Sequence, residues 1–580
     1  MSADQRYGAK PEIKVDGSEL SAELELLIEK VMVDTDLHQP DMFTLTFRDN
    51  ERNVLERSGI DIGKEIDIAT TPIGDGSQTR LMIGDVVGVE VHFGRQGTMT
   101  VVRGFDRSHR FRRGRHTRTF SNVSDTDIAR QIADEVSVKV GNIDIREVVY
   151  DHVSQINMTD WDFLTGRAQE AGYEIAVVDG ELEMVRPTPS DRGPDGGDIQ
   201  TEDPLQLTLG ATLDRFMGRV TAAGQVSEVE VRGWDIKQKE PIVSSRQAET
   251  KSAAVDKSPT DLAGTFGGSP KYVVFDRPIE TQAEADIAAE GIAEQIASAH
   301  AEADGVAPGN PALRPGVPVS VNLVGKPYDG KYVLTSATHL YSDAGYKTSF
   351  RVSGRQDRSL LGLATMGGSR GAQSAGGTKI YGVVPATVAD VQDPEGLGRV
   401  RLKFPWLADD YESWWARLTQ FGAGADTRGS LFLPEVDDEV LVAFEHGDIR
   451  RPYVIGSLYN GQDTPNVDGV VDGSSGEINR REIRSRTGHR LEFYEEPGKS
   501  AIEIHEANDG LEILMSGTDR KITITSDGEV EITGSTSMTI KADMDVTIEA
   551  GTSLELKGGT GVKIDGGPQV EVTGGMVKLN

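Results

Sequence analysis

Few residues of this 580-residue chain have the types and spacing that catalysis or metal binding requires. His446, in the segment 444–448 (FEHGD), could act as a base or metal ligand, but no second histidine lies at a suitable spacing. A histidine in a turn beside Gly447 and Asp448 is the simpler interpretation. Residues 551–580 contain no histidine, so we expect no metal near the C-terminus. No Ser–His–Asp order stands out. We therefore predict no catalytic residue, no cofactor-binding residue and no metal ligand.

The chain has one basic run, in residues 103–118, and its arginines could in principle contact nucleic acid. The net charge, however, is -32, with 61 basic and 93 acidic residues, which disfavours nucleic acid and anionic membrane surfaces as general partners. We therefore predict no nucleic-acid partner. Salt bridges within an oligomer or to neighbouring subunits are the preferred interpretation. The arginines are Arg103, Arg107, Arg110, Arg112, Arg113, Arg115 and Arg118.

Composition favours a protein built from short strands. The chain has 66 glycines, and hydrophobic residues make up only 37% of it. It has no cysteine, which excludes disulfides and thiolate sites. The N-terminal sequence lacks an apolar core of signal-peptide length, and no run of about 18 apolar residues could span a bilayer. We expect synthesis and assembly in the cytoplasm without a signal peptide.

Local patterns predict mainly strands, with three helices. Residues 11–110 alternate between apolar and polar side chains, as in antiparallel sheets with one solvent-exposed face. A capping box at residues 124–127 and the cap Thr159 each begin a helix, the second ending at Gly172. A third helix is predicted at 283–303, with Gly305 as its stop signal. Residues 190–198 are rich in turn formers, and 248–264 read as a flexible loop.

An eight-residue repeat fills the C-terminal region. Apolar residues recur every eight positions, and each is followed two positions later by another. An i, i+2 pair indicates a short strand with two inward side chains. The pairs are 522/524, 530/532, 538/540, 546/548, 554/556, 562/564 and 570/572. Val577 and Leu579 come one residue early and end the array.

One octad is too short to wind a closed coil by itself. A coil with three faces needs roughly 18–24 residues, so three chains that each supply one octad per level would close a prism. The alternative, a free-standing meander of one chain, leaves the second face and the strand edges unexplained. The repeat therefore predicts an intertwined trimeric β-helix, a stiff polar rod.

Several motifs resemble VgrG-type spike proteins of contractile injection systems and their phage-tail relatives. The barrel region carries most of them: residues 398–406 (GRVRLKFPW), 413–417 (SWWAR), 432–442 (FLPEVDDEVLV), 444–452 (FEHGDIRRP) and 455–460 (IGSLYN). The N-terminal half is similar at 39–43 (QPDMF), 104–106 (GFD), 113–115 (RGR), 160–164 (DWDFL), 171–173 (AGY), 330–332 (GKY) and His339.

This resemblance implies a domain order. A hub at residues 1–365, with two barrel-like subdomains and a few helices, would be followed by a linker at 366–378. An OB-fold barrel would occupy 379–462, a connector 463–480, and a triple-stranded β-helix needle 481–580. About 20 residues separate barrel and needle, too few for the lysozyme domain that some relatives carry there. The chain stops soon after the last octad, so we expect no effector domain there.

The resemblance also implies a function, that of a structural and non-enzymatic spike. A homotrimeric hub with six-fold pseudo-symmetry would cap the inner tube protein and contact baseplate proteins. The needle end would receive a PAAR-repeat tip protein, possible effector cargo would travel with it, and contact with the target membrane would be transient. The spike would then belong to a phage tail-like particle, extracellular rather than toxin-fused, that is released or delivered into a target envelope. The alternative is a spike or adhesin whose hub holds a cryptic hydrolytic or glycan-binding site, with residues 190–270 the least readable part.

Overall fold

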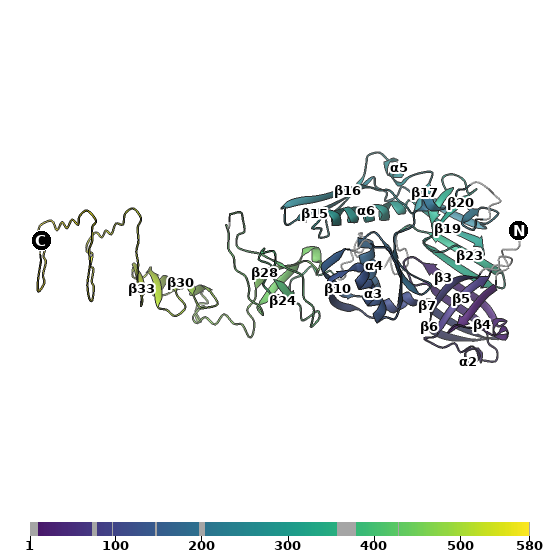
Figure 1. Cartoon of the computed structure of the whole chain (residues 1–580), viewed down its shortest axis with the longest axis horizontal. Coiled ribbons are helices and arrows are strands. Elements are labelled where there is room, and N and C mark those ends of the chain that lie inside the picture. Colours follow the sequence, from purple (N-terminus) through teal and green to yellow (C-terminus); the bar gives the residue numbers. More distant parts are fainter. Residues whose placement is uncertain are drawn as a thin grey trace. The chain divides into compact units, whose positions relative to one another are not determined.

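The chain divides into two compact units, Met1–Asp463 and Thr464–Asn580, which we describe separately (Figure 1). The computed structural model describes residues 10–71, 78–95, 97–145, 148–196, 203–355, 379–426 and 428–578. The predicted linker at 366–378 lies outside these residues. The prediction of a mainly β protein with a few helices is confirmed.

An eleven-stranded sheet organises the N-terminal part of the first unit. It joins two halves edge to edge, because β3 pairs antiparallel with β22 from Val31↔Tyr341 to Asp36↔Ser336. Each half has its own core, one around Phe43 and Phe47, the other around Tyr332 and Phe350. In sheet order the strands are β14 (Arg215–Val220), β19 (Ala301–Pro308), β23 (Gly345–Val352), β22 (Ser336–Ser342), β3 (Ile28–Asp36), β4 (Met42–Arg48), β7 (Gly97–Asp106), β6 (Thr79–Gly94), β5 (Glu65–Thr71), β1 (Lys10–Val15) and β2 (Ser18–Glu19).

Two helices lie between these halves in the sequence and pack on small sheets, and both match the sequence prediction. In α3 (Asp125–Glu135), Ser124 and Asp127 form the predicted capping box. In α4 (Asp160–Glu170), the Thr159 side chain accepts a hydrogen bond from the Asp162 amide. Trp161 and Leu182 lie in the shared core. The surrounding elements are η2 (Arg107–Arg112), β8 (His116–Ser124), β9 (Lys139–Ile143), β10 (Val149–Met158), β11 (Glu174–Val178) and β12 (Glu181–Val185).

The third predicted helix is shorter than expected. Helix α6 spans Gln282–Ser298, and Gly305 lies inside β19 instead of ending the helix. The residues predicted as a flexible loop, 248–264, contain β17 (Ala253–Val255) and α5 (Pro259–Gly264). The other elements of this unit are α1 (Ala22–Glu25), α2 (Val54–Ser58), η3 (Ser190–Arg192), β13 (Gln206–Thr208), β15 (Glu228–Asp235), β16 (Glu240–Gln247), β18 (Lys271–Val274), β20 (Pro318–Asn322) and β21 (Gly330–Val333).

A small barrel-like sheet follows, in the region predicted to be an OB fold. Its strand order is β25 (Arg401–Lys403), β24 (Val384–Asp390), β27 (Glu439–Phe444), β28 (Pro452–Ser457) and β26 (Arg417–Leu418). Val388, Phe404 and Val442 lie in its core, together with Ile156 from β10 of the hub. The hub and this domain therefore share one core.

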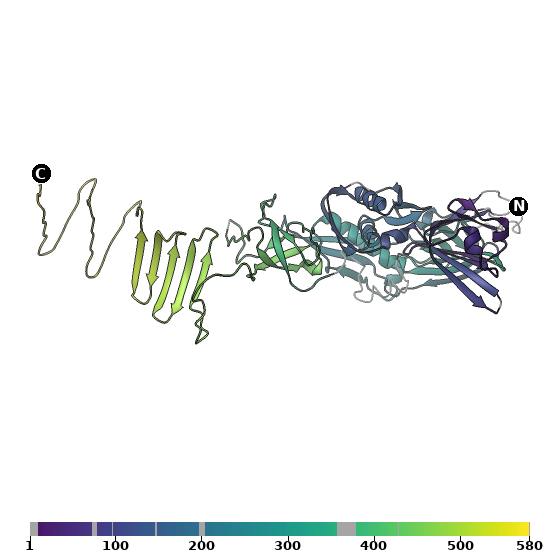
Figure 2. The same cartoon turned by 90° about the horizontal axis from the view of Figure 1, so that it is seen from below.

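The second unit begins with a five-stranded antiparallel meander (Figure 2). Its strands are β29 (Arg480–Arg484), β30 (Arg490–Glu496), β31 (Lys499–His505), β32 (Leu511–Ser516) and β33 (Lys521–Ser526). Residues 527–578 continue without a strand. The intertwined β-helix is therefore not formed by the single chain and remains a prediction. Among the described residues, no helix combines the length and apolar character needed to cross a bilayer.

Candidate functional site

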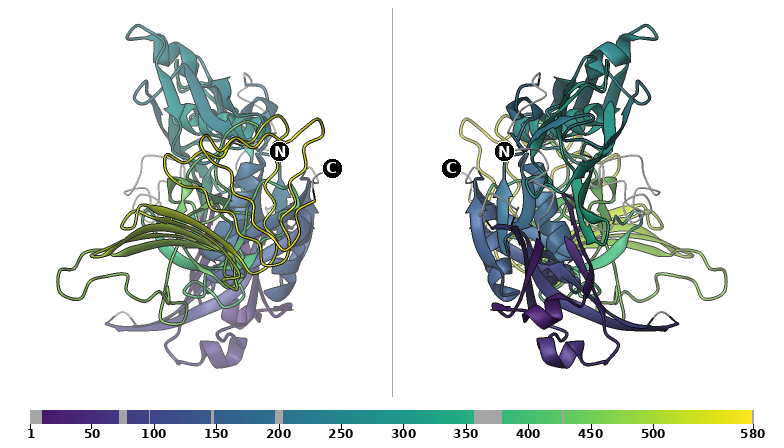
Figure 3. Two further views of the ribbon diagram at one scale, coloured as in Figure 1. Left: turned by 90° about the vertical axis from the view of Figure 1, so that its left-hand side faces the viewer. Right: turned by 90° about the vertical axis from the view of Figure 1, so that its right-hand side faces the viewer.

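One face of the sheet β29–β33 is apolar and open to solvent. Strand register aligns a row of side chains across all five strands and a second row across four. The first row is Ile483, Leu491, Ile504, Ile513 and Ile524; the second is Phe493, Ile502, Met515 and Ile522. Ile504 is 44% exposed and Ile524 60%. Seen end-on, the strands lie over one another with a progressive twist (Figure 3). A single copy of the chain thus leaves one whole sheet face uncovered, a feature typical of an interface.

The opposite face of the same sheet is polar and internally paired. Glu492 is buried, and it accepts hydrogen bonds from Arg480 and from the Tyr494 hydroxyl, the latter at 3.2 Å. The Arg490 Nε also lies 3.2 Å from Glu492. Burial alone would raise the pKa of Glu492, but Arg480, Arg490 and the Tyr494 hydroxyl together outweigh burial, so the pKa lies below its ordinary value. This face has its own partners and needs no further chain.

Glu492, Glu503 and His505 offer ligand atoms within 4.8 Å of one another on this polar face, the spacing of a metal site. These carboxylates already have cationic partners, since Arg480 and Arg490 contact Glu492 and the Lys499 ammonium lies 3.1 Å from Glu503. His505 Nε2 lies 3.1 Å from Glu503. We interpret the group as an ion-pair network. The sequence analysis missed it, because only strand register brings these residues together.

The octad pairs after β33 are exposed in the single chain. The side chains from Val530 to Val572 that form the pairs are 54–71% exposed. No strand ladder joins residues 527–578, so most of their backbone N–H and C=O groups lack protein partners in one copy. Backbone groups of a folded protein are almost always paired. In a single copy, residues 527–578 therefore lack both a core and strand neighbours.

The basic run 103–118 has partners inside its own chain. Arg103 Nε lies 2.8 Å from Glu90, and Arg110 forms two hydrogen bonds with Asp85, at 2.7 and 2.9 Å. Further partners are Glu65 for Arg107, the Trp161 ring for Arg112, the Asn157 carbonyl for Arg115 and Asp160 for Arg118. These six arginines therefore have contacts within their own chain, and salt bridges to other subunits stay a prediction.

Two carboxyl groups of the hub, Asp41 and Asp106, lie close enough to influence each other's protonation. Burial raises the pKa of Asp106 to about 7. Burial also raises the pKa of Asp41 well above its usual range, and the charge of Asp106 raises it further. The Ser108 hydroxyl donates to Asp106 at 2.5 Å, and the Asp36 amide donates to Asp41 at 2.9 Å. Neither group faces a nucleophile or a second catalytic residue in the described contacts.

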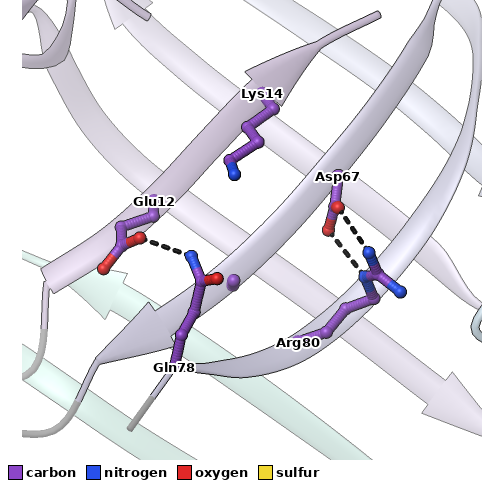
Figure 4. Close-up of a pocket in the computed structure, with 6 residues that line it drawn as sticks. Glu12, Lys14, Asp67, Gln78 and Arg80 are labelled. Atoms are coloured by element: carbon purple, nitrogen blue, oxygen red, sulfur yellow. Dashed lines mark hydrogen bonds and ion pairs between the residues drawn. The ribbon is translucent and has the colours of Figure 1, made fainter. Parts of the chain in front are cut away.

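One polar pocket of the first unit has a volume of about 250 Å³ (Figure 4). It is lined by Glu12, Lys14, Asp67, Ala69, Gln78 and Arg80 on strands β1, β5 and β6 and the residue before β6. Two hydrogen bonds, of 3.0 and 2.8 Å, join Arg80 to Asp67, and Gln78 donates to Glu12. These side chains satisfy one another, and the lining offers neither a nucleophile–base pair nor an aromatic sugar platform.

His446 lies in the short helical turn Glu445–Gly447, with φ of 50°. This placement agrees with the interpretation of a turn histidine. The predicted absence of catalytic, cofactor and metal residues is not tested by these contacts and stays a prediction.

Two protein-family models match segments of the first unit. Residues 384–459 match the family model of the type VI secretion system/phage-baseplate injector OB domain. Residues 7–343, more than half of the chain, match the model of the Alg8 N-terminal domain. The chain belongs to the Alg8 N-terminal domain family. The OB fold predicted from sequence is confirmed.

Individual relatives agree with the predicted resemblance. The type VI secretion system spike protein VgrG3 of Vibrio cholerae is 30% identical over 140 residues, which cover 23% of this chain and 14% of that protein. The actin cross-linking toxin VgrG1 of Vibrio cholerae is 30% identical over 134 residues, 21% of this chain and 12% of that protein. The chain thus matches only about a seventh of the length of these curated relatives. The toxin in the name of VgrG1 describes that relative.

A solved structure extends the fold comparison over most of the chain. A chain of the Francisella PdpA-VgrG complex, in its lidded form, aligns with a TM-score of 0.53 at 10% identity, covering 90% of this chain and 80% of that one. The half-lidded form gives 0.52, covering 89% and 88%. Together with the curated relatives, these findings confirm the resemblance to VgrG-type spike proteins.

Proposed function

We propose that the chain is the structural spike subunit of a contractile injection system and that it works as a homotrimer. The observation that carries this proposal is the C-terminal segment, where octad pairs are exposed and the backbone has no strand partners in a single copy. The match to the type VI secretion system/phage-baseplate injector OB domain and the resemblance to VgrG-type spikes support the same function.

Three copies satisfy both requirements of the octad segment at once. Each octad supplies one short strand per level, and strands from the other two copies complete the backbone hydrogen bonds. Fully burying one Val, Leu or Ile side chain stabilises a fold by about 1.5–3 kcal/mol. Repeated over seven pairs, this gain explains how a chain without disulfides forms a stiff rod.

In the assembled machine, the trimeric hub caps the inner tube at the centre of the baseplate, in contact with both. The needle receives a PAAR-type tip protein, and effector cargo can travel with it. When the sheath contracts, the needle punctures the target envelope and contacts the target membrane only transiently. The chain works without enzymatic turnover. It is made and assembled in the cytoplasm, then forms part of a phage tail-like particle that is released or delivered into the target envelope.

Electron microscopy of particles isolated from the native source, with a tag on this chain, tests the proposal. The tag is expected at the baseplate centre of contractile particles, and particles from a deletion strain should lack the central spike. Intact, infective or toxic particles in the deletion strain would contradict the proposal.

A further inference from the structure

The second unit changes its mode of strand pairing near residue 526. From β29 to β33 every strand pairs with its sequence neighbour in the same chain. From residue 527 to 578 no strand forms in the single chain, although the octad pairs continue at the same spacing. The sheet can therefore form within one copy, whereas the octads need neighbours.

The octad array cannot fix its own register. Every pair consists of Val, Ile, Leu or Met, and the pairs are equally spaced by eight residues. Shifting one chain by eight residues against the others places apolar side chains opposite apolar side chains, so the shift costs little except at the two ends. Strands with a repeated pattern are prone to such slippage.

The sheet β29–β33 lacks this ambiguity. Its connections differ in length, with residues 485–489, 497–498, 506–510 and 517–520 between successive strands. Its apolar face mixes Phe493 and Met515 with β-branched and Leu side chains. No shift of one copy along another superimposes this face on itself.

Charge also favours further copies of this chain as the occupant of the face. Copies that each carry a charge of -32 repel one another. The two aligned rows contain no charged residue; the charged side chains beside them on that face, Arg481 and Glu495, pair with each other. Electrostatic repulsion between copies of this chain is therefore weakest at these two rows. The polar face is occupied by its own ion pairs, which leaves the apolar face for docking.

We propose that the apolar face of β29–β33 is a register clamp, where three copies meet first and fix the alignment from which the octads then wind together. The inference rests on the trimer proposed above. In this proposal, the sheets of three copies associate first and fix the register of the chains. The distal octads then wind together only after the sheets have associated.

Substitutions in the full-length chain separate the two parts of the needle. The double variant Ile504→Asp, Ile513→Asp places charges in the clamp and is expected to run as a single chain of 62.7 kDa, a threefold loss of mass. The double variant Val562→Asp, Ile564→Asp should keep the trimeric mass, about three times that value, with new protease cleavage confined to the distal octads. Thr525→Lys, on the polar face beside Glu512, is the matched control and should stay trimeric.

The outcomes distinguish the clamp from the trimer itself. A trimeric clamp variant, or a monomeric distal variant, overturns the clamp. A monomeric wild-type chain overturns the proposed function instead. Thermal unfolding of the hub, measured on each variant, shows whether the first unit remains folded and the loss of mass is specific.

Register is measured separately with the milder variant Ile504→Ser, Ile513→Ser at a concentration where it still trimerises. After limited proteolysis, intact-mass spectrometry should give one core length for the wild type. The variant should give several core lengths that differ by whole octads. A single core length from the variant contradicts a role in register.

Discussion

The His152 ring of β10 stacks on Trp414 of the OB domain, with ring centroids 5.4 Å apart and planes tilted by 29°. Its Nε2 lies 3.2 Å from the Glu412 carbonyl oxygen. Four positions further along the same strand, Ile156 enters the OB core. Side chains of this hub strand therefore pack into the OB domain.

Ile156→Ala tests this shared core. Ile156 is 3% exposed, and removing its side chain leaves a cavity, so we expect a loss of about 2–5 kcal/mol in unfolding free energy. Urea unfolding followed by tryptophan fluorescence measures it. Val149→Ala, at a 68% exposed position of the same strand, serves as the control. Equal stability of the two variants would show that the hub strand does not enter the OB core.

The buried carboxyl group of Asp106 makes hub stability depend on pH. Its pKa is raised to about 7 in the folded state, against an ordinary value of 3.8. A raised folded pKa stabilises the fold fully below the unfolded pKa, and this stabilisation is lost as the pH rises through the folded value. Thermal unfolding should therefore show stability falling between about pH 4 and pH 7, by about 1.4 kcal/mol for each pH unit crossed.

Asp106→Asn removes one of the two buried carboxyl groups and should make that pH profile less steep, while Asp41 still contributes to it. Asp409→Asn, at an exposed position of the OB domain, is the control and should leave the profile unchanged. A profile in Asp106→Asn as steep as that of the wild type would assign the pH dependence to other groups.

Gly305→Ala tests the packing of the sheet strand that replaced the end of the predicted helix. A Cβ at this position would lie 2.1 Å from the Phe350 ring, so the variant should lose about 1–3 kcal/mol in unfolding free energy. Gly291→Ala, on the open surface of α6, has nothing within 4 Å and should instead gain about 1 kcal/mol. Differential scanning calorimetry compares the two. Opposite signs are expected, and a stable Gly305→Ala protein would contradict the strand placement.

Inward-facing octad residues are tested by Val546→Asp with Ile548→Asp. In a trimer this variant buries six charges, and each unpaired buried charge costs several kcal/mol. Resistance of the trimer to heat and detergent, followed on gels without boiling, should be lost. Thr547→Asp, on the intervening outward position, should retain it. Resistance in both variants would show that the apolar pairs do not face inward.

Much of the fold could be predicted because its signals are local. The capping box of α3, and the Thr159 cap and Gly172 stop signal of α4, are readable from a few neighbouring residues, and the octads from their spacing alone. The end of α6 could not be predicted, because residues 299–303 (AHAEA) continue the alanine-rich helical pattern. Pairing of β19 with β14 and β23 overrides that preference, and these partners lie far away in the sequence.

The apolar face of β29–β33 could be predicted only in part, because its alignment also depends on pairing between strands. Residues 491–515 alternate, but the unequal connections hide any repeat, so the sequence pattern begins only at Ile522. The ion pairs around Glu492 depend on the register of the three strands β29, β30 and β31. Such register is fixed by hydrogen bonding between strands, which composition and spacing do not reveal.

Native mass spectrometry of the wild-type chain across a dilution series measures the association on which the account depends. If the octad segments of three chains form one intertwined β-helix, we expect a single species of about 188 kDa, three times 62.7 kDa, that persists at nanomolar concentration. A stable, folded species of 62.7 kDa at micromolar concentration would contradict it.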